Sequence, residues 1–490
     1  MFAYLMIAGY LLLLVGVTVI AHRKTKTLDD FFLGGRGIGP WMSAMAYGTT
    51  YFSAVLFIGY AGQIGWNFGL SGVWVGIGNS IIGCLLAWLV LAKRTREMTG
   101  KLGVRTMPEF LEARFDSRNL KIFSALIIFI FLVPYSASVF MGLSYLFEEV
   151  FGISYSLALA LITIFTLIYL VFGGYLAVNL ADVIQGVIMI AGMLLLLKSI
   201  VWHPEAGGII AGINKLHSID PALTAPIGPP GFIPLASLVI LTSLGSWGLP
   251  QMIHKFYAVK DDQSIKIATI VTTIFALILA GGAYFLGSYT HLFFDAVPLE
   301  NGKPNTDLLM PMLINRVVPE ALTVLIVILI LSASMSTLSS LVLVSSSVIS
   351  IDLAGTLLPK LSAKASLRVM RACCAVFVLL SLWLATARPG FILTLMSISW
   401  GTIAGVFLAP YLYGLYYKKA TRTGAWAAAL TGLAISLGFN IALNFSSAKV
   451  PMVGSLAMLV PLLVLPAVSL VTQDVPAHVV SKAFPVPSEN

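Results

Sequence analysis

Stretches of about twenty mostly apolar residues without charges recur along almost the whole chain, and they constrain its fold more than any other feature. An α-helix of that length matches the thickness of the hydrocarbon layer of a bilayer. Only 10% of the residues are charged and the mean hydropathy is +0.97, whereas a soluble domain carries roughly 25% charged residues. The chain is therefore predicted to be an all-α, polytopic membrane protein.

The apolar stretches predict about thirteen transmembrane helices in a single domain that spans 1–490. The expected spans are 2–21, 42–64, 72–92, 122–146, 153–172, 179–201, 233–254, 267–290, 321–349, 371–387, 391–416, 424–444 and 451–471. The first span lacks a basic n-region and a small-residue cleavage site, so we interpret it as a retained helix and not as a signal peptide. Residues 473–490 are polar and contain prolines, which predicts a loosely ordered cytoplasmic tail.

The formal net charge of +9 is explained by where the basic residues fall. Most of the 29 Lys and Arg residues lie in alternate loops, on one side of the predicted membrane, and we place Lys255 among them at a helix end. Basic loops are retained on the cytoplasmic side. This bias predicts a plasma-membrane protein with its N-terminus outside and its C-terminus in the cytoplasm. The positive charge then gives no reason to expect a nucleic-acid partner.

Enzyme motifs are absent from the sequence. It contains no GxxxxGK[ST] loop and no HExxH pair, and the GGRGIG motif at 34–39 follows no predicted strand. The three cysteines lie in apolar runs and predict no disulfide framework. We therefore expect a protein that is not an enzyme and has no organic cofactor. Uphill transport by such a chain would need an ion gradient.

Two of the predicted spans are interrupted near their middle. The span at 42–64 contains AYGTTYFSAV, in which Gly48 weakens the helix and hydroxyl side chains follow it. The span at 233–254 contains SLGSWGLPQ, in which two glycines precede Pro250. Interrupted backbone at membrane depth must be buried in protein or line a cavity.

The two interrupted spans occupy corresponding places in two halves of five helices each. This arrangement is typical of inverted-repeat transporters, whose binding site lies near the bilayer midplane between the broken helices. We therefore predict a first repeat at 42–201 and a second at 233–416. The span at 2–21 is an extra helix before them, and 424–471 supplies two C-terminal helices.

The predicted ninth span contains the run LSASMSTLSSLVLVSSSVIS at 331–350, in which half of the residues are Ser or Thr. Four serines spaced at i, i+4, i+7 and i+8 share one helical face: Ser332, Ser336, Ser339 and Ser340. Uncharged oxygens of this kind coordinate hard cations such as Na⁺. The alternative is that the hydroxyls bond back to their own helix or join neighbouring helices.

Asp182, in GGYLAVNLADVIQG, is the acid we expect at membrane depth. A buried carboxylate near the serine face would neutralise a bound cation. Alternatively, Asp182 lies in the first turn of a helix at the cytoplasmic surface, just after Gly173 and Gly174. Asn79, an amide inside another apolar span, is equally compatible with a ligand contact and with a bond between helices.

Several motifs resemble those of the sodium:solute symporter family, which includes sodium/proline, sodium/pantothenate and sodium/glucose transporters. They are FFLGGRGIGPW at 31–41, TYFSAVLFIG at 50–59, FGISYSLAL followed by GGYLAVNLADVIQG, and SASMSTLSSLVLVSSS at 332–347, in the family's order. The resemblance implies thirteen helices with a leucine-transporter-type core, in which one extra helix precedes two inverted five-helix repeats.

The resemblance also implies where sodium binds. The first site would use the backbone carbonyls of Thr49, Phe52 and Ala333 together with the hydroxyls of Ser336 and Thr337. Some members have a second sodium site, and its positions fall here on Asp182, Ser339 and Ser340, with Ser336 shared. All of the required residue types are present.

Substrate contacts implied by the resemblance come from Tyr51, Ser53, Asn79, Tyr135, Thr242, Trp247 and Gln251. The proline transporters resemble this chain at Tyr135, but they carry an aspartate at the position of Tyr51 and a tryptophan at that of Thr242. The motif TYFSAVLFIG is more similar to the pantothenate transporters. The expected pocket is neutral and aromatic.

These features predict a Na⁺-coupled secondary active symporter that works by alternating access. Its substrate would be a small organic solute: a monocarboxylate, a pantothenate-like acid, or an amino acid such as proline. Proton coupling in the same fold, a channel and a membrane sensor module are the alternatives. The sequence leaves open the substrate, the number of Na⁺ ions per cycle and the oligomeric state.

Overall fold

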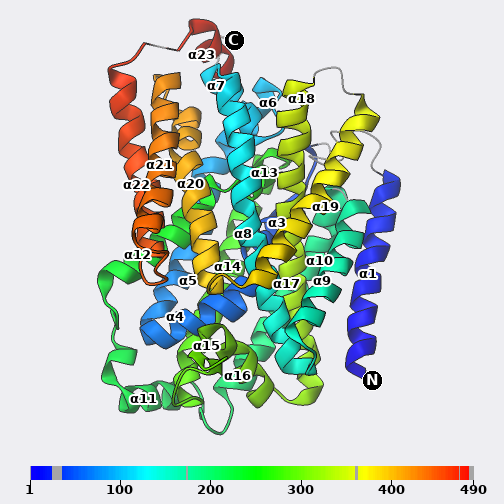
Figure 1. Ribbon diagram of the computed structural model, residues 1–490, viewed down its shortest axis with the longest axis vertical. Helices are drawn as coiled ribbons and strands as arrows, with labels where there is room; N and C mark the ends of the chain where they lie inside the picture. Colours follow the sequence, from blue (N-terminus) through cyan, green and yellow to red (C-terminus); the bar gives the residue numbers. More distant parts are fainter. Residues whose placement is uncertain (1, 25–35, 173–174, 359–361, 474, 485–490) are drawn as a thin grey trace.

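The computed structural model describes residues 2–24, 36–172, 175–358, 362–473 and 475–484. Its helices run side by side in one bundle, with α11 and α16 at one end and α6, α7 and α23 at the other (Figure 1). In the described part, the strands are the hairpin β1 (Leu299–Glu300) and β2 (Lys303–Pro304), which pairs Leu299 with Pro304. Some predicted features lie outside the described residues: 31–35 of the first family motif, Gly173 and Gly174, and positions 474 and 485–490 of the tail.

The long helices are α1 (Phe2–Lys24), α8 (Arg118–Phe151), α9 (Tyr155–Phe172), α10 (Tyr175–Val201), α17 (Glu320–Ser347), α19 (Ala363–Ala387), α20 (Ile392–Tyr416), α21 (Arg422–Ala442) and α22 (Val450–Leu470). The segmented spans comprise α3 (Pro40–Tyr51), η2 (Val55–Tyr60), α4 (Ala61–Phe68), η3 (Gly69–Gly72), α5 (Val73–Ser80), η4 (Ile81–Leu86), η5 (Trp88–Ala92), α6 (Lys93–Leu102), α12 (Phe232–Ser243), η7 (Leu244–Gly248), α13 (Pro250–Tyr257), α14 (Asp262–Ala276), η8 (Leu277–Gly281), α15 (Gly282–Ser288) and η9 (Tyr289–Leu292). Shorter elements at the ends of the bundle are α7 (Met107–Phe115), α11 (Ile209–Ile219), η6 (Pro221–Thr224), η10 (Thr306–Leu308), α16 (Leu309–Val317), η11 (Val348–Ala354), α18 (Gly355–Leu357) and α23 (Ala477–Ala483).

The described residues include 9 helices that are long and apolar enough to cross a membrane, or 10 if the bent pair α12–α13 forms one span. Shorter apolar helices occur at Leu5–Val17 and Tyr155–Ile168. A multi-pass helical membrane architecture is thereby confirmed. The count of about thirteen spans, which rests on apolar length, stays a prediction, and so does the division into repeats.

The region predicted as spans 42–64 and 72–92 is divided at Gly69, where α4 ends. Gly69 has a φ of 57°, and a Cβ there would lie 2.4 Å from the carbonyl oxygen of Leu223. Because glycine has no Cβ, it tolerates both the left-handed backbone conformation and the close contact with Leu223. After this turn, the helical path continues through α5 to Leu102, so it extends further than the predicted end at residue 92.

The structure confirms both predicted interruptions. α3 ends at Tyr51, Phe52 is extended (φ −116°, ψ 129°), and helix resumes at Val55. In the second interruption Leu249 is extended (φ −85°, ψ 120°), and α12–η7 and α13 differ in direction by 45°. Gly48 is not itself the break. It stays helical and serves packing, since a Cβ there would lie 2.7 Å from the Phe275 ring.

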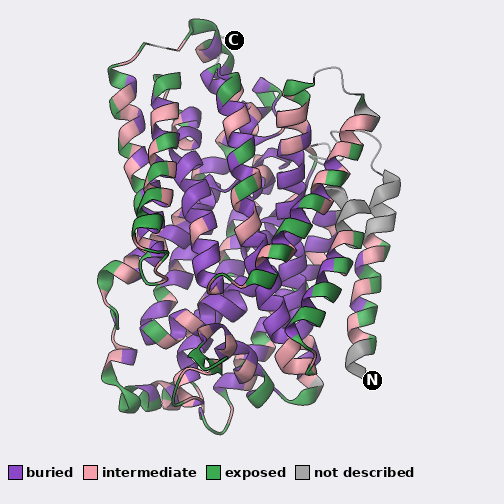
Figure 2. Ribbon diagram, viewed as in Figure 1, coloured by how far each residue is buried: buried purple, intermediate pink, exposed green. Residues whose placement is uncertain are grey.

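The best-covered helices lie in the middle of the bundle (Figure 2). In the most apolar segment of the span that contains α17, 89% of the residues are buried, and in that of α20 the buried share is 94%. In the corresponding segments of α19 and α21, only 33% of the residues are buried. The serine-rich helix α17 is therefore central. Its hydroxyls face other protein groups and not lipid.

Candidate functional site

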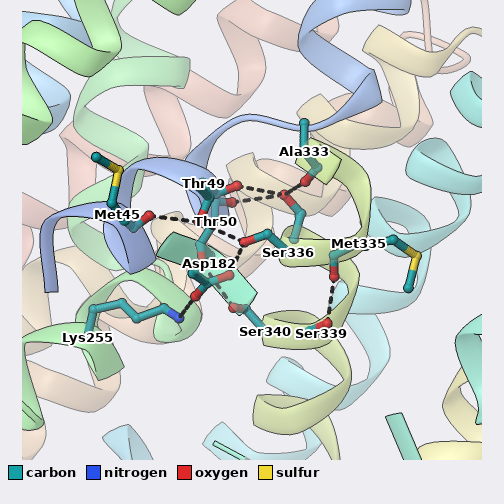
Figure 3. A network of polar contacts seen from close by, with 11 residues as sticks. Met45, Thr49, Thr50, Asp182, Lys255, Ala333, Met335, Ser336, Ser339 and Ser340 are labelled. Carbon is teal, nitrogen blue, oxygen red and sulfur yellow. Dashed lines mark hydrogen bonds and ion pairs between the residues drawn. The ribbon is translucent and has the colours of Figure 1, made fainter. Parts of the chain in front are cut away.

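Four elements meet in the interior of the bundle: the C-terminal end of α3, and α10, α13 and α17 (Figure 3). They bring together Thr49 from α3, Asp182 from α10, Lys255 from α13 and Ser336 from α17. The side chains are 0–3% exposed. Because water does not cover them, each polar group must be satisfied by the protein or by a ligand.

The Thr337 hydroxyl lies among four backbone carbonyl oxygens. The distances are 3.1 Å to Ala333, 3.2 Å to Thr50, and 3.4 Å to both Thr49 and Phe52. Three of these carbonyls come from the end of α3, where the last turn of a helix leaves its carbonyls without intrahelical partners. A hydroxyl has one hydrogen to donate. The excess of oxygen lone pairs gives this group, here called the Thr337 cage, the chemistry that suits a hard cation.

Ser336 joins the Thr337 cage to a buried carboxylate. Its hydroxyl oxygen is 2.6 Å from Asp182 Oδ1 and 2.8 Å from Thr49 Oγ1, while the Thr49 hydroxyl donates to the Met45 carbonyl at 2.7 Å. An ionised carboxylate is the stronger acceptor. The single Ser336 hydrogen is within reach of two acceptors, Asp182 Oδ1 and Thr49 Oγ1, and the carboxylate is the favoured one. The second oxygen of Asp182 lies 3.4 Å from Lys255 Nζ.

This geometry excludes the alternative for Asp182 and corrects the prediction for Lys255. Asp182 is not in the first turn of its helix, because α10 begins at Tyr175 and leaves Asp182 fully buried two turns in. Lys255 does not lie at a cytoplasmic surface, because α13 begins inside the bundle just after the break. A second acid, Asp352, is also buried and accepts a 2.8 Å hydrogen bond from Thr106.

Several other serines of α17 have partners of their own. Ser339 donates to the Met335 carbonyl at 2.6 Å, and the Ser340 and Thr50 hydroxyls are 2.9 Å apart. Among the described contacts, neither serine is bonded to Asp182. The hydroxyls of 345–347 donate to carbonyls one turn back, as the packing alternative predicted for this helix.

A small cavity of about 20 Å³ lies beside the first break, and this space is enough for roughly one water molecule. It is lined by Tyr51, Phe52, Ser53, Val55, Leu56, Tyr60, Asn79, Thr242, Tyr284, Met396 and Trp400. Four of the seven predicted substrate residues are in this lining: Tyr51, Ser53, Asn79 and Thr242. No lining residue is charged, in agreement with the neutral, aromatic pocket expected from the sequence.

The polar lining residues also hold the two broken helices together. The Tyr51 hydroxyl donates to the Thr242 carbonyl at 2.6 Å, and Asn79 Oδ1 accepts from Thr242 at 2.9 Å and from Ser243 at 3.0 Å. Asn79 thus both bonds between helices and faces the cavity. The Ser53 hydroxyl oxygen accepts from the amide of Val55 at 3.2 Å and stabilises the restart of the helix.

Three predicted substrate residues lie outside this lining. Tyr135 contacts Trp400 edge-on, with ring centroids 5.8 Å apart, and the Trp247 indole donates to the Ile82 carbonyl at 2.9 Å. The Oε1 atom of buried Gln251 has no hydrogen-bond partner among the described residues. Trp400, absent from the sequence prediction, stacks on Tyr51 at 5.9 Å. It lies between Ser399 and Gly401 in α20, and this sequence context does not identify it as a residue of a pocket.

A second cavity, of about 770 Å³, begins one helical turn from the first on both broken helices. Ile64 in its wall follows Tyr60 of the small cavity by one turn, and Leu238 precedes Thr242 by one turn. The larger cavity also contacts the α21–α22 turn, through Lys449.

Residues 31–432 of the chain match the sodium:solute symporter family. The chain belongs to this family. Its members are transporters and not enzymes, and Na⁺ is their coupling ion. The symporter is thus a multi-pass membrane protein that couples Na⁺ to the movement of a small solute.

Relatives of this symporter include proline transporters. Over 425 residues it is 32% identical to the osmoregulated proline transporter OpuE of Bacillus subtilis, covering 85% of this chain and 84% of the relative. It is 31% identical over 427 residues to the high-affinity proline transporter PutP of the same species, covering 86% and 88%. The identity to a sodium/proline symporter of Staphylococcus aureus is 30% over 437 residues, covering 88% and 84%.

Solved structures with the same fold include a Na⁺-coupled sialic acid symporter in a substrate-bound outward-open state. Its TM-score is 0.75 at 20% identity, over 97% of this chain and 99% of that one. The nucleobase-cation-symport-1 transporter Mhp1, in a closed conformation, follows with a TM-score of 0.52 at 16% identity, over 95% and 98%. The leucine-transporter-type fold predicted from the sequence is confirmed.

Proposed function

We propose that this symporter imports a small organic solute and that its coupling ion binds in the Thr337 cage. The observation that carries the proposal is the single Thr337 hydroxyl among four carbonyl oxygens within 3.4 Å. The proposed ligands are the carbonyls of Thr49, Phe52 and Ala333 and the hydroxyls of Ser336 and Thr337. This set is neutral, all oxygen and buried, and it spans two helices.

Asp182, Ser339 and Ser340 have the oxygen chemistry of a second sodium site. Two ions per cycle is therefore the alternative to one. The buried carboxylate supports this alternative, because a negative charge at membrane depth requires a neutralising partner. The present partners of Ser339 and Ser340, a carbonyl of their own helix and Thr50, weigh against it.

For the substrate, we propose a compact solute with an apolar body and few polar groups, and proline is the first candidate. The support is the uncharged cavity between Tyr51 and Trp400, together with the proline transporters among the relatives. Tyr51, Ser53, Asn79 and Thr242 would contact the solute directly. Tyr135, Trp247 and Gln251 would join the contact surface as the cavity widens. A monocarboxylate and a pantothenate-like acid are the other candidates.

Coupling would follow from where the ion and the solute bind. An ion in the Thr337 cage ties the end of α3 to α17, beside the cavity that receives the solute. If this ion stabilises the solute-binding form, the solute stabilises ion binding by the same factor. The 770 Å³ cavity would be the outer approach, with the N-terminus outside and the C-terminus cytoplasmic. The repeats at 42–201 and 233–416 would rock against each other.

The test is transport by the purified protein in sealed proteoliposomes. With Na⁺ outside and K⁺ inside, labelled proline, lactate and pantothenate are offered separately, and at least one should accumulate above its outside concentration. Collapse of the Na⁺ gradient with an ionophore should abolish the accumulation. Accumulation driven by a pH gradient without Na⁺ would instead establish proton coupling and contradict the proposal. A sodium conductance independent of solute would indicate a channel.

A further inference from the structure

A lysine is buried in the interior of the symporter, beside the carboxylate of the candidate second site. Lys255 is 3% exposed, and its Nζ is 3.4 Å from Oδ2 of the fully buried Asp182. The lysine side chain extends from α13 toward this carboxylate (Figure 3). It reaches this depth because the break at Leu249 starts α13 inside the bundle, and Lys255 is only its sixth residue.

The Lys255 ammonium supplies the charge that a sodium ion would bring to Asp182. Both cations carry one positive charge, and an ammonium has three hydrogens to direct at oxygen atoms. A sodium ion bound here together with Lys255 would place two positive charges beside one carboxylate at low dielectric, where repulsion between like charges is strong. The residues around Asp182 therefore fit a tethered ammonium better than a second metal ion.

The neighbouring hydroxyls agree with this assignment. Of the three serines assigned to the second site, only Ser336 is bonded to Asp182 in the described contacts. Ser339 donates to the Met335 carbonyl, and Ser340 shares a hydrogen bond with the Thr50 hydroxyl. A sodium ion needs several oxygens converging on one point, whereas a lysine needs fewer because it is held by its own chain.

We infer that Lys255 takes the place of a second sodium ion at Asp182, so that the symporter binds a single Na⁺, in the Thr337 cage. This inference rests on the proposed function of that cage. Lys255 is then a positioning residue. By keeping Asp182 neutralised and in place, it holds the carboxylate that accepts the Ser336 hydrogen beside the cage.

The number of bound ions tests the inference directly. Saturation binding of ²²Na⁺ to the purified, full-length symporter should give about one ion per chain, with a Hill coefficient of about one. Lys255→Met keeps the apolar stem but removes the charge, so binding should rise to about two ions per chain. The double variant Asp182→Asn/Lys255→Met removes both charges and should return to about one. Lys266→Met, at an exposed lysine of α14, is the matched control and should not change the count.

The outcomes separate this inference from the proposed function. Two ions on the unmodified protein would overturn the role of Lys255 while leaving the Thr337 cage intact. One ion on folded Lys255→Met would overturn it as well. If Lys255→Met does not fold, the counts on the unmodified protein and on the neutral double variant still decide, since the inference requires about one on each. Absence of saturable binding to the unmodified protein would refute the cage, and the inference with it.

Discussion

The Thr337→Val substitution removes one oxygen from the Thr337 cage while almost preserving the shape of the side chain. In the structure, that hydroxyl lies 3.1–3.4 Å from four carbonyls, so it belongs to the proposed ion shell and not to its edge. A hydrogen bond to a charged group is worth about 1.5–3 kcal/mol, and we take this as the scale for one neutral oxygen ligand of a cation. The Na⁺ concentration for half-maximal uptake should therefore rise roughly 10- to 150-fold.

The assay is the dependence of solute uptake on Na⁺ in proteoliposomes that contain equal amounts of folded protein. The control is Thr163→Val, which removes a buried hydroxyl that donates only to the Leu159 carbonyl of its own helix at 2.7 Å. This control should shift the half-maximal Na⁺ concentration less than about twofold, because a back-bonded threonine contributes little beyond its helix. Thr337→Ser keeps the hydroxyl and should recover most of the affinity.

Equal Na⁺ dependence in Thr337→Val, Thr163→Val and the unmodified protein would refute the assignment of Thr337 to the ion site. A loss of maximal uptake without a change in half-maximal Na⁺ would also count against it, because removal of an ion ligand must weaken ion binding first. Thermal stabilisation of the detergent-purified protein by Na⁺ gives a second readout that does not depend on the solute.

Three further predictions concern packing, the solute and pH. Trp400→Ala removes the ring stacked on Tyr51 and should raise the KM for the solute about tenfold or more, with a smaller effect on half-maximal Na⁺. Gly287→Ala places a Cβ 1.9 Å from the Ala61 carbonyl oxygen and should abolish folded protein in size-exclusion profiles, whereas Gly438→Ala, with nothing within 4 Å, should not. Burial raises the pKa of Asp307, in the loop before α16, from 3.8 to about 7, although the Ile392 amide donates to it. The folded protein holds this proton more tightly than the unfolded chain does. Protonation of Asp307 therefore stabilises the folded state fully below about pH 4, and this stabilisation disappears as the pH rises to about 7. The free energy of unfolding should decline by at most roughly 4 kcal/mol over this pH range. Asp307→Asn should remove this decline, which is followed by measuring thermal melting as a function of pH.

The broken helices could be predicted from sequence because Gly and Pro act locally. Pro250 and the glycines before it weaken the helix wherever it packs, and the second break falls among them. The first break lies at Phe52, four residues after Gly48. The backbone leaves the helix there because groups from other helices can bond to the carbonyl oxygens that the break exposes. That location depends on Thr337, 285 residues away from Phe52 along the chain, and no local pattern shows such a partner.

The errors have the same origin in contacts between distant segments. Lys255 looks like any basic residue near a helix end, and only the direction of α13 after its break shows that it reaches Asp182. The residues around Trp400 do not distinguish it from the other aromatic residues of the chain, and its role beside Tyr51 appears only when α20 is placed against α3. The family resemblance found the positions of the proposed sodium ligands, because it carries three-dimensional information that periodicity does not.

Phe52 belongs to both proposed sites at once. Its carbonyl oxygen is 3.4 Å from the Thr337 hydroxyl, while its ring lines the small cavity and stacks on Tyr51 with centroids 4.5 Å apart. One residue in extended conformation thus carries a proposed ion ligand and a wall of the proposed solute pocket. Communication between ion and solute then needs no chain of intermediates across the protein. A solute that moves this ring also reorients the carbonyl of the same residue, which is the proposed ion ligand. Because ring and carbonyl belong to one residue, a mutation at Phe52 would affect both binding events.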